Sequence, residues 1–195
     1  LAVEVGNPPQ LWRTHVALDP RLDGFAPDAW ARILADLAAE TGATRIVAAG
    51  TERGNEVLAR VAARLDVPFA ANVVSVGAGG EMTRVRWGGS LLEDARMSAP
   101  VEVLSVQPHA VAVAETGSGP AEIRDLTPRL DDADLVVRVV DHVGAAAGGV
   151  SLSDAKIVVS AGRGAGSPEG FAGVEELAGL LGGAVGCSRA VTIAG

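Results

Sequence analysis

A glycine-rich loop near the end of the chain has the residue types that bind an anion. It comprises residues 161–167, in which Gly162 and Gly164 flank Arg163. An apolar stretch at residues 157–160 precedes the loop, and a helical pattern follows it. Glycines let the backbone approach a phosphate closely, a helix N-terminus adds aligned N–H groups, and a guanidinium adds forked, charged hydrogen bonds. The pattern therefore predicts a cradle for a phosphate or a nucleotide.

A second pair of polar residues follows the next apolar stretch, residues 184–186. Ser188 and Arg189 come just after it. Ligands of open parallel sheets bind at the carboxyl ends of the strands, so Arg163 and Arg189 are expected to face one crevice. An ordinary tight turn between a strand and a helix produces the same glycine pattern. The spacing alone leaves both interpretations open.

The loop departs from the dinucleotide-binding fingerprint. Ser167 stands where a third glycine or an alanine belongs, and no acidic residue ends a strand about 20 positions later. Such an acid binds the ribose of a nicotinamide cofactor. A nicotinamide-dependent dehydrogenase domain is therefore disfavoured, and we keep it only as an alternative.

Other candidates for catalysis or metal binding are weak. The histidines are far apart and none has metal-ligand spacing: His15, His109 and His142. His142 and its neighbour Asp141 would point to opposite faces of a strand. Ser188 has no evident His and Asp partners for nucleophilic catalysis. The tryptophans are interpreted as packing or interface anchors: Trp12, Trp30 and Trp87.

Composition excludes several classes of protein. The chain has 195 residues, with 16 basic and 24 acidic side chains, and the net charge of −8 disfavours nucleic-acid binding. No apolar run approaches the ~20 residues of a membrane-spanning helix. Cys187 is the only cysteine, so we expect a reducing compartment and no internal disulfide. Lys156 is the only lysine, against 15 arginines, and with the abundant Ala and Gly this favours a GC-rich bacterial genome. Together with the reducing compartment, it leads us to expect a bacterial, cytoplasmic protein.

The first part of the chain alternates helices and strands. Apolar residues recur at helical spacing between Pro27 and Gly42, which suit a helix start and a helix stop. A strand at residues 45–49, a helix at 57–65 and a strand at 71–76 follow. This order indicates an α/β fold, in which a mostly parallel sheet carries helices on its faces.

From residue 77 onward the pattern changes. Residues 81–87, 101–106 and 110–114 alternate polar and apolar side chains, as antiparallel strands do. Residues 116–134 are polar and are interpreted as an exposed loop. Residues 135–140 predict one more strand.

A domain boundary is expected at about residue 150, because residues 144–149 are small and rich in glycine. Residues 1–150 would form an N-terminal α/β domain, and residues 151–195 the start of a second α/β domain that binds a nucleotide. In this second domain a helix at 168–181 separates the two apolar strands, with Ser167 as its N-cap. The chain begins at Leu1 and ends at Gly195 after an apolar run, so we expect it to be part of a longer protein.

Two motifs separated by this helix carry a family resemblance. The first is the strand and loop at residues 157–164, followed by Ser167 and Phe171, and the second is the segment at 186–190. Together they resemble the alpha subunits of electron-transfer flavoproteins, whose pattern is a V-S-G-G-R-G loop, a helix with the Glu-Leu-Ala of residues 176–178, and a G-A-S-R-A segment. The segment Arg84 to Gly89 also resembles that family's R-x-x-Y-x-G, with Trp87 in the aromatic position.

The resemblance implies a function. Alpha subunits of this family form a heterodimer with a beta subunit, and their C-terminal domain holds most of the contacts to FAD. The protein carries electrons from flavin dehydrogenases, such as those of fatty acid β-oxidation, to a quinone-linked acceptor of the respiratory chain. It is an electron carrier and turns over no substrate of its own.

The resemblance also assigns roles to residues. The residues that match Arg163 and Ser188 contact FAD, and the residue that matches Arg189 lies against the isoalloxazine ring. Gly162 and Gly164 belong to the same cofactor-binding loop. A guanidinium beside the ring stabilises the negative charge that reduction adds, because arginine stays charged when it is partly buried.

The chain departs from the family pattern at three points, and the last two favour a second hypothesis. Cys187 replaces a small alanine and is expected to be an inert core residue. Ile193 stands where the family often has Asp, and the chain ends before the G-x-T and S-G-A-x-Q-H motifs. The alternative is an interaction module that assembles with a partner and whose flavin site has decayed.

Overall fold

The structure is a computed structural model that describes residues 2–5, 13–112, 122–141, 152 and 155–192. The chain forms two compact units, Leu1–Val140 and Asp141–Gly195. Each unit is described by itself. The domain boundary expected near residue 150 lies outside the described residues and stays a prediction.

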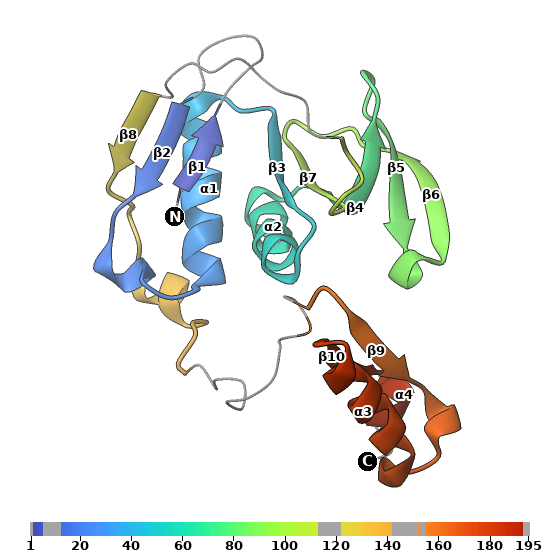
Figure 1. The fold of residues 1–195 in the computed structure, drawn as a ribbon. Helices are drawn as coiled ribbons and strands as arrows, with labels where there is room; N and C mark the ends of the chain where they lie inside the picture. The colour runs from blue at the N-terminus through green and yellow to red at the C-terminus, as the bar shows by residue number, and fades with distance from the viewer. Residues whose placement is uncertain (1, 6–12, 113–121, 142–151, 153–154, 193–195) are drawn as a thin grey trace. The chain divides into compact units, whose positions relative to one another are not determined.

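A five-stranded sheet forms one side of the first unit (Figure 1). Its strand order is β3-β7-β4-β5-β6. The first three strands in this order are parallel, and the last two continue the sheet antiparallel. The bounds are β3 Arg45–Ala49, β4 Phe69–Val76, β5 Glu81–Arg86, β6 Leu91–Arg96 and β7 Glu102–Val106. The mixed α/β class expected from the sequence is confirmed.

Strand β7 corrects one prediction. Residues 101–106 were expected to be antiparallel, but β7 lies between β3 and β4 and is parallel to both. Alternation of side chains shows that a segment is extended, but it does not show which strand is its partner. The strand β6 was not predicted at all, because Glu93, Asp94 and Arg96 make its sequence polar.

Helix α2 (Glu52–Leu65) packs on the sheet, and helix α1 (Pro27–Thr41) packs on α2. Helix α1 ends at Gly42 in the left-handed conformation, as predicted. Helix α2 begins at Thr51, whose Oγ1 accepts a hydrogen bond from the N–H of Gly54 at 3.1 Å. The core between α2 and the sheet consists of buried aliphatic side chains: Ile46, Val57, Leu58, Val61 and Val103.

The other side of α1 packs against a small sheet. This sheet has the order β1-β2-β8, with bounds β1 Ala2–Val5, β2 Arg13–Ala17 and β8 Glu122–Leu126 (Figure 1). Ala29 and Ile33 of α1 cluster with Ala17 of β2 and with Leu126 of β8. Helix α1 is therefore covered on two sides, which explains its many buried alanines.

Three predictions for the second half of this unit are wrong. Residues 116–134 were interpreted as a loop, but they include β8, which pairs with β2 over a long sequence distance. Of the strand expected at 110–114, residues 110–112 form no strand, and 113–114 lie outside the described residues. Residues 135–140 form no strand, because Leu135 ends a 3-10 turn, η3 (Asp132–Leu135).

A buried carboxylate anchors η3. Asp134 is 1% exposed, pairs with Arg64 of α2, and accepts a hydrogen bond from the N–H of Asp131. The Asp131 side chain caps the same turn by accepting from the N–H groups of Ala133 and Asp134. These contacts favour a helical turn over an extended strand here.

The second unit is a short α/β motif. Strands β9 (Val158–Ala161) and β10 (Ala184–Cys187) are parallel and adjacent. The segment between them forms the 3-10 turns η4 (Arg163–Ala165) and η5 (Pro168–Phe171) and helix α3 (Ala172–Leu180). Helix α4 (Arg189–Thr192) follows β10. Both predicted strands and the helix are confirmed, except that the first turn after Ser167 is 3-10.

The turn that follows β2 yields a prediction about pH. The Asp19 carboxylate caps η1 (Pro20–Leu22) by accepting from the backbone N–H of Arg21 at 2.9 Å, and it also binds the Arg21 guanidinium. The side-chain hydrogen bond from Arg21 is the main reason that the pKa of Asp19 falls from 3.8 to about 2. Because the pKa of Asp19 is lower in the folded state, its ionised carboxylate stabilises the fold at any pH above the pKa of the unfolded chain. This contribution is lost as the pH falls toward about 2.

We therefore expect carboxyl NMR titration to give Asp19 a pKa of about 2. In the Arg21→Ala variant, the pKa should return toward 3.8. The pKa of Glu93, which a side-chain hydrogen bond from Arg84 lowers, should not change in this variant and serves as an internal control. An Asp19 pKa that does not move in the variant would contradict the assigned cause.

Candidate functional site

The carboxyl ends of β9 and β10 form the candidate site. Cys187 lies opposite Ala161 in the parallel register, and the N–H of Ser188 donates to the Ala161 carbonyl at 3.2 Å. The segments that leave the two strands therefore start from one edge. Every residue predicted for the site lies in these segments: Gly162, Arg163, Gly164, Ser188 and Arg189.

Gly162 and Ser188 come together at this edge. A Cβ placed on Gly162 would lie 3.8 Å from the Ser188 Oγ, so the hydroxyl lies next to the Gly162 backbone. Gly164 has open space on its Cβ side, and its backbone is accessible. Gly162, Gly164 and Ser188 are all exposed, so a ligand can reach the backbone of the loop and the hydroxyl.

The two arginines take up their positions through short turns. Arg163 begins η4, which is closed by hydrogen bonds from Ala165 N–H to the Gly162 carbonyl at 3.0 Å and from Gly166 N–H to the Arg163 carbonyl at 3.1 Å. Arg189 begins α4, in which Val191 N–H donates to the Ser188 carbonyl at 2.8 Å. Both arginines are exposed.

The hydrogen bond made by the Ser167 side chain differs from the predicted helix cap. Ser167 occupies the N-cap position of η5, but its side chain makes no capping hydrogen bond to the backbone. Its hydroxyl instead bonds to the Glu169 carboxylate, which is the main reason that the pKa of Glu169 lies below its usual value.

The donor set at this edge fits an anionic cofactor such as FAD. It offers two guanidiniums, one hydroxyl and a glycine-rich backbone, which are groups that bind phosphate oxygens and stabilise negative charge. Among the described residues, no group of three or more His, Cys, Asp or Glu side chains is placed to hold a metal ion.

Several residues weighed in the sequence analysis lie elsewhere. His15 is buried in β2, and His109 lies in a turn, whereas His142 and Trp12 are outside the described residues. The Trp30 ring packs edge-on against Phe25 at 5.1 Å, which confirms its packing role. Cys187 is exposed on β10, so the expectation of a core residue was wrong. Trp87 is also exposed, and its role as an interface anchor stays a prediction.

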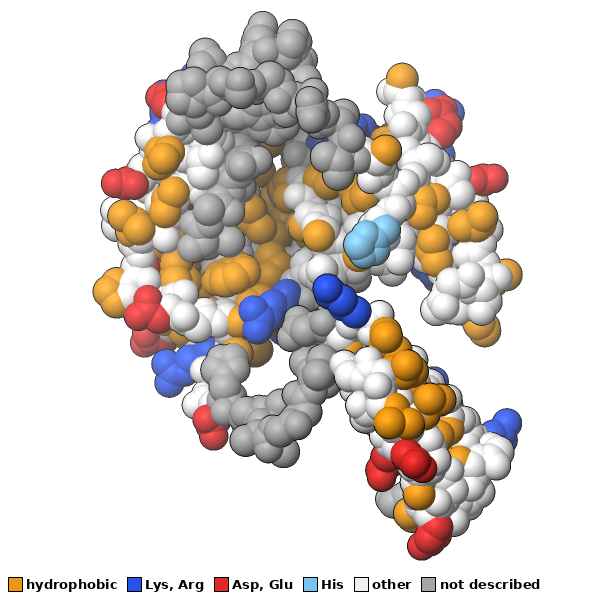
Figure 2. All heavy atoms as spheres, viewed as in Figure 1, with side chains coloured by type: hydrophobic (Ala, Val, Ile, Leu, Met, Phe, Trp, Pro, Cys, Tyr) orange, Lys and Arg blue, Asp and Glu red, His pale blue; other side chains and the backbone are white. Residues whose placement is uncertain are grey.

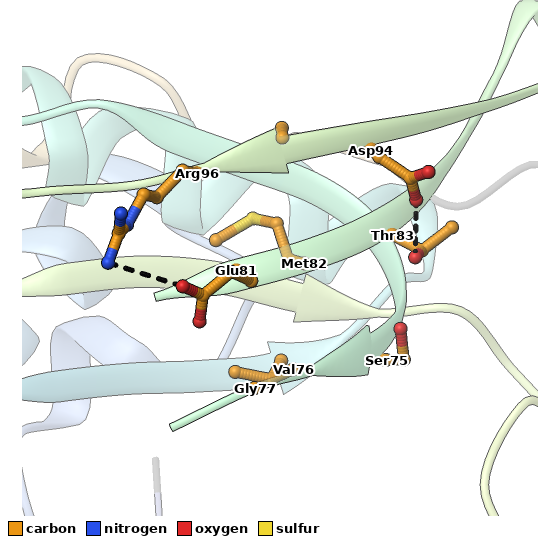
Figure 3. Close-up of a pocket in the computed structure, with 9 residues that line it drawn as sticks. Ser75, Val76, Gly77, Glu81, Met82, Thr83, Asp94 and Arg96 are labelled. Atoms are coloured by element: carbon orange, nitrogen blue, oxygen red, sulfur yellow. Dashed lines mark hydrogen bonds and ion pairs between the residues drawn. The ribbon is translucent and has the colours of Figure 1, made fainter. Parts of the chain in front are cut away.

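An open groove in the first unit was not predicted. It has a volume of about 660 Å³ and lies at the ends of β4, β5 and β6 (Figure 3). Its charged and polar side chains bind one another: Arg96 pairs with Glu81 at 3.2 Å, and Thr83 donates to Asp94 at 2.8 Å. Because these groups satisfy each other, the groove offers few open contacts to a ligand.

Family models of known proteins match both units of the chain. The family model of the electron transfer flavoprotein domain matches residues 11–130, and that of the electron transfer flavoprotein FAD-binding domain matches residues 151–195. The chain belongs to the electron transfer flavoprotein alpha-subunit family. The second match includes β9, the glycine loop and the edge described above.

Curated relatives support the same family. The chain is 30% identical over 177 residues to the electron transfer flavoprotein subunit alpha of Bacillus subtilis, covering 89% of this chain and 54% of that protein. It is 31% identical to Protein FixB of Clostridium saccharobutylicum, covering 90% and 54%. It is 32% identical to the alpha subunit of Mycobacterium tuberculosis, covering 94% and 57%. The chain therefore spans about half the length of these relatives.

Among the described residues, no helix has both the length and the apolar character needed to cross a membrane.

Proposed function

We propose that this chain forms part of the FAD site of an electron carrier, as the alpha subunit of an electron transfer flavoprotein. The observation that carries the proposal is the parallel pairing of β9 and β10. This pairing starts the glycine loop and the Ser188–Arg189 segment from one edge, with the Ser188 hydroxyl beside Gly162.

Each residue at the edge has a role in this proposal. FAD, when bound, supplies a ring that accepts and releases electrons. Arg163 and Ser188 would hold the cofactor by hydrogen bonds, and Gly162 and Gly164 would let it approach the backbone. Arg189 would supply a permanent positive charge to the site, which would stabilise negative charge on the reduced cofactor.

The proposal extends to the partners and setting of the protein. A beta subunit completes the cofactor site, flavin dehydrogenases donate electrons, and a quinone-linked acceptor receives them. The chain turns over no substrate of its own. A reducing bacterial cytoplasm suits its single cysteine and its arginine-rich composition.

The test is to purify the product of the complete gene together with its beta partner. We expect a yellow heterodimer that releases FAD on denaturation, as identified by chromatography against FAD and FMN standards. A folded heterodimer without flavin absorbance would overturn the proposal.

One observation favours an assembly role as the second candidate. Apolar side chains are exposed on the second unit, among them Leu177, Leu180 and Leu181, and Figure 2 shows apolar side chains on the visible face of this unit. The same purification separates the two functions, because a colourless but stable heterodimer would support assembly alone.

A further inference from the structure

Gly170 lies unusually close to the turn that carries Arg163. A Cβ built on Gly170 would collide with the carbonyl oxygen of Ala165 and lie 2.8 Å from its carbonyl carbon. These are backbone atoms, which cannot rotate away as a flexible side chain does. Any side chain at position 170 therefore requires the backbone at Ala165 to move.

Ala165 is tied directly to the candidate site. It is the last residue of η4, and its N–H donates to the carbonyl of Gly162 at 3.0 Å. Its carbonyl accepts a hydrogen bond from the N–H of Ser167 at 2.8 Å. The first residue of the same turn is Arg163. A displacement of Ala165 therefore moves the turn that positions this guanidinium.

Gly170 is in close contact with the loop backbone, whereas the glycines of the following helix α3 have open space where a Cβ would lie. Gly173 and Gly179 of α3 have no heavy atom within 4 Å of a built Cβ. The η5 turn that contains Gly170 is held by a hydrogen bond from the Gly170 N–H to the Ser167 carbonyl at 3.0 Å. The absence of a side chain at position 170 lets η5 pack onto η4.

We propose that Gly170 is a positioning residue of the cofactor site, which acts by seating η5 against Ala165 and thereby orienting Arg163. The inference rests on the proposed function. It adds a residue outside the loop, with no contact to the cofactor required, to the set that determines affinity for FAD.

The test compares Gly170→Ala with Gly173→Ala in the complete protein co-expressed with its beta partner. The dissociation constant for FAD is measured by fluorescence titration of the flavin-free complex. We expect Gly170→Ala to bind FAD about 10- to 100-fold more weakly, the factor that corresponds to loss of a charge-assisted hydrogen bond. Gly173→Ala makes the same chemical change without a collision and should keep the affinity of the unmodified complex.

Repeating the Gly170→Ala change in a complex that already carries Arg163→Ala distinguishes a positioning role from general damage to the fold. If Gly170 acts through Arg163, the Gly170→Ala change should cause no further loss of affinity in an Arg163→Ala complex. An equal loss in both backgrounds, or an unchanged affinity in the first, would overturn the inference. If the unmodified complex binds no FAD, the proposed function fails instead, so the two failures are distinguishable.

If the Gly170→Ala variant does not fold, a substitution at Gly166 perturbs the same turn and can be tested in its place. Gly166 follows η4 and has a φ of +75°, with no heavy atom near a built Cβ. Gly166→Ala strains the backbone at the end of the same turn without a collision. It should weaken FAD binding in the unmodified background and have no effect in the Arg163→Ala background. Equal effects in both would again contradict the role assigned to Arg163.

Discussion

Replacing Arg189 with alanine should lower the reduction potential of the bound flavin by about 60 mV or more, which corresponds to about 1.4 kcal/mol for one electron. The reason is electrostatic. A fixed positive charge a few ångströms from the ring stabilises the reduced, more negative form by several kcal/mol at an effective dielectric constant of about 20, and partial exposure reduces this value. The potential is measured by reductive titration of the heterodimer against a reference dye.

Two variants control for charge and for position. Lys156→Ala also removes one positive charge from the second unit, but Lys156 precedes the amino end of β9, opposite the candidate site. Its potential should stay close to that of the unmodified complex. Arg189→Lys keeps the charge but loses the planar fork, so an intermediate potential is expected. Equal potentials for Arg189→Ala and Lys156→Ala would contradict the role of Arg189.

The second large effect concerns stability. Leu58 has no exposed surface and lies in the core between α2 and the five-stranded sheet, in contact with the cluster that contains Val61 and Val103. Leu58→Ala removes buried methyl groups and leaves a cavity, which should lower the free energy of unfolding by about 2–5 kcal/mol. Urea unfolding followed by tryptophan fluorescence measures this change, because Trp30 packs against the same cluster.

Leu92→Ala is the matched control. The same side chain is removed, but Leu92 is 71% exposed on β6. Its free energy of unfolding should change by no more than about 0.5 kcal/mol. A similar loss for both variants would show that Leu58 does not lie in a well-packed core.

The sequence alone was sufficient where the evidence is local. The helical spacing between Pro27 and Gly42 and the apolar run at Arg45–Ala49 predicted α1 and β3 with little error. The glycine loop and the Ser188–Arg189 segment were also visible, because their residue types and interval form a motif. Periodicity and short motifs depend only on residues close together in the sequence, so they can be identified without knowledge of the fold.

The sequence failed where pairing between distant segments decides the structure. Strand β8 has a charged sequence and becomes a strand by pairing with β2, and Glu122 then binds Arg13 at 3.0 Å. Residues 135–140 look extended, but the buried Asp134 and its partner Arg64 favour a turn. In both cases a tertiary contact outweighs the local preference.

What the sequence determined by itself is therefore the α/β class, the main helices and the motif that identifies the family. Only the tertiary structure decided that β7 lies between β3 and β4, that Cys187 is exposed, and that Ser188 lies beside Gly162. It also showed that Gly170 packs closely against Ala165, in the turn that begins at Arg163. The physical reason is that strand order, burial and close backbone contacts depend on residues far apart in the chain or on atomic spacing, neither of which periodicity records.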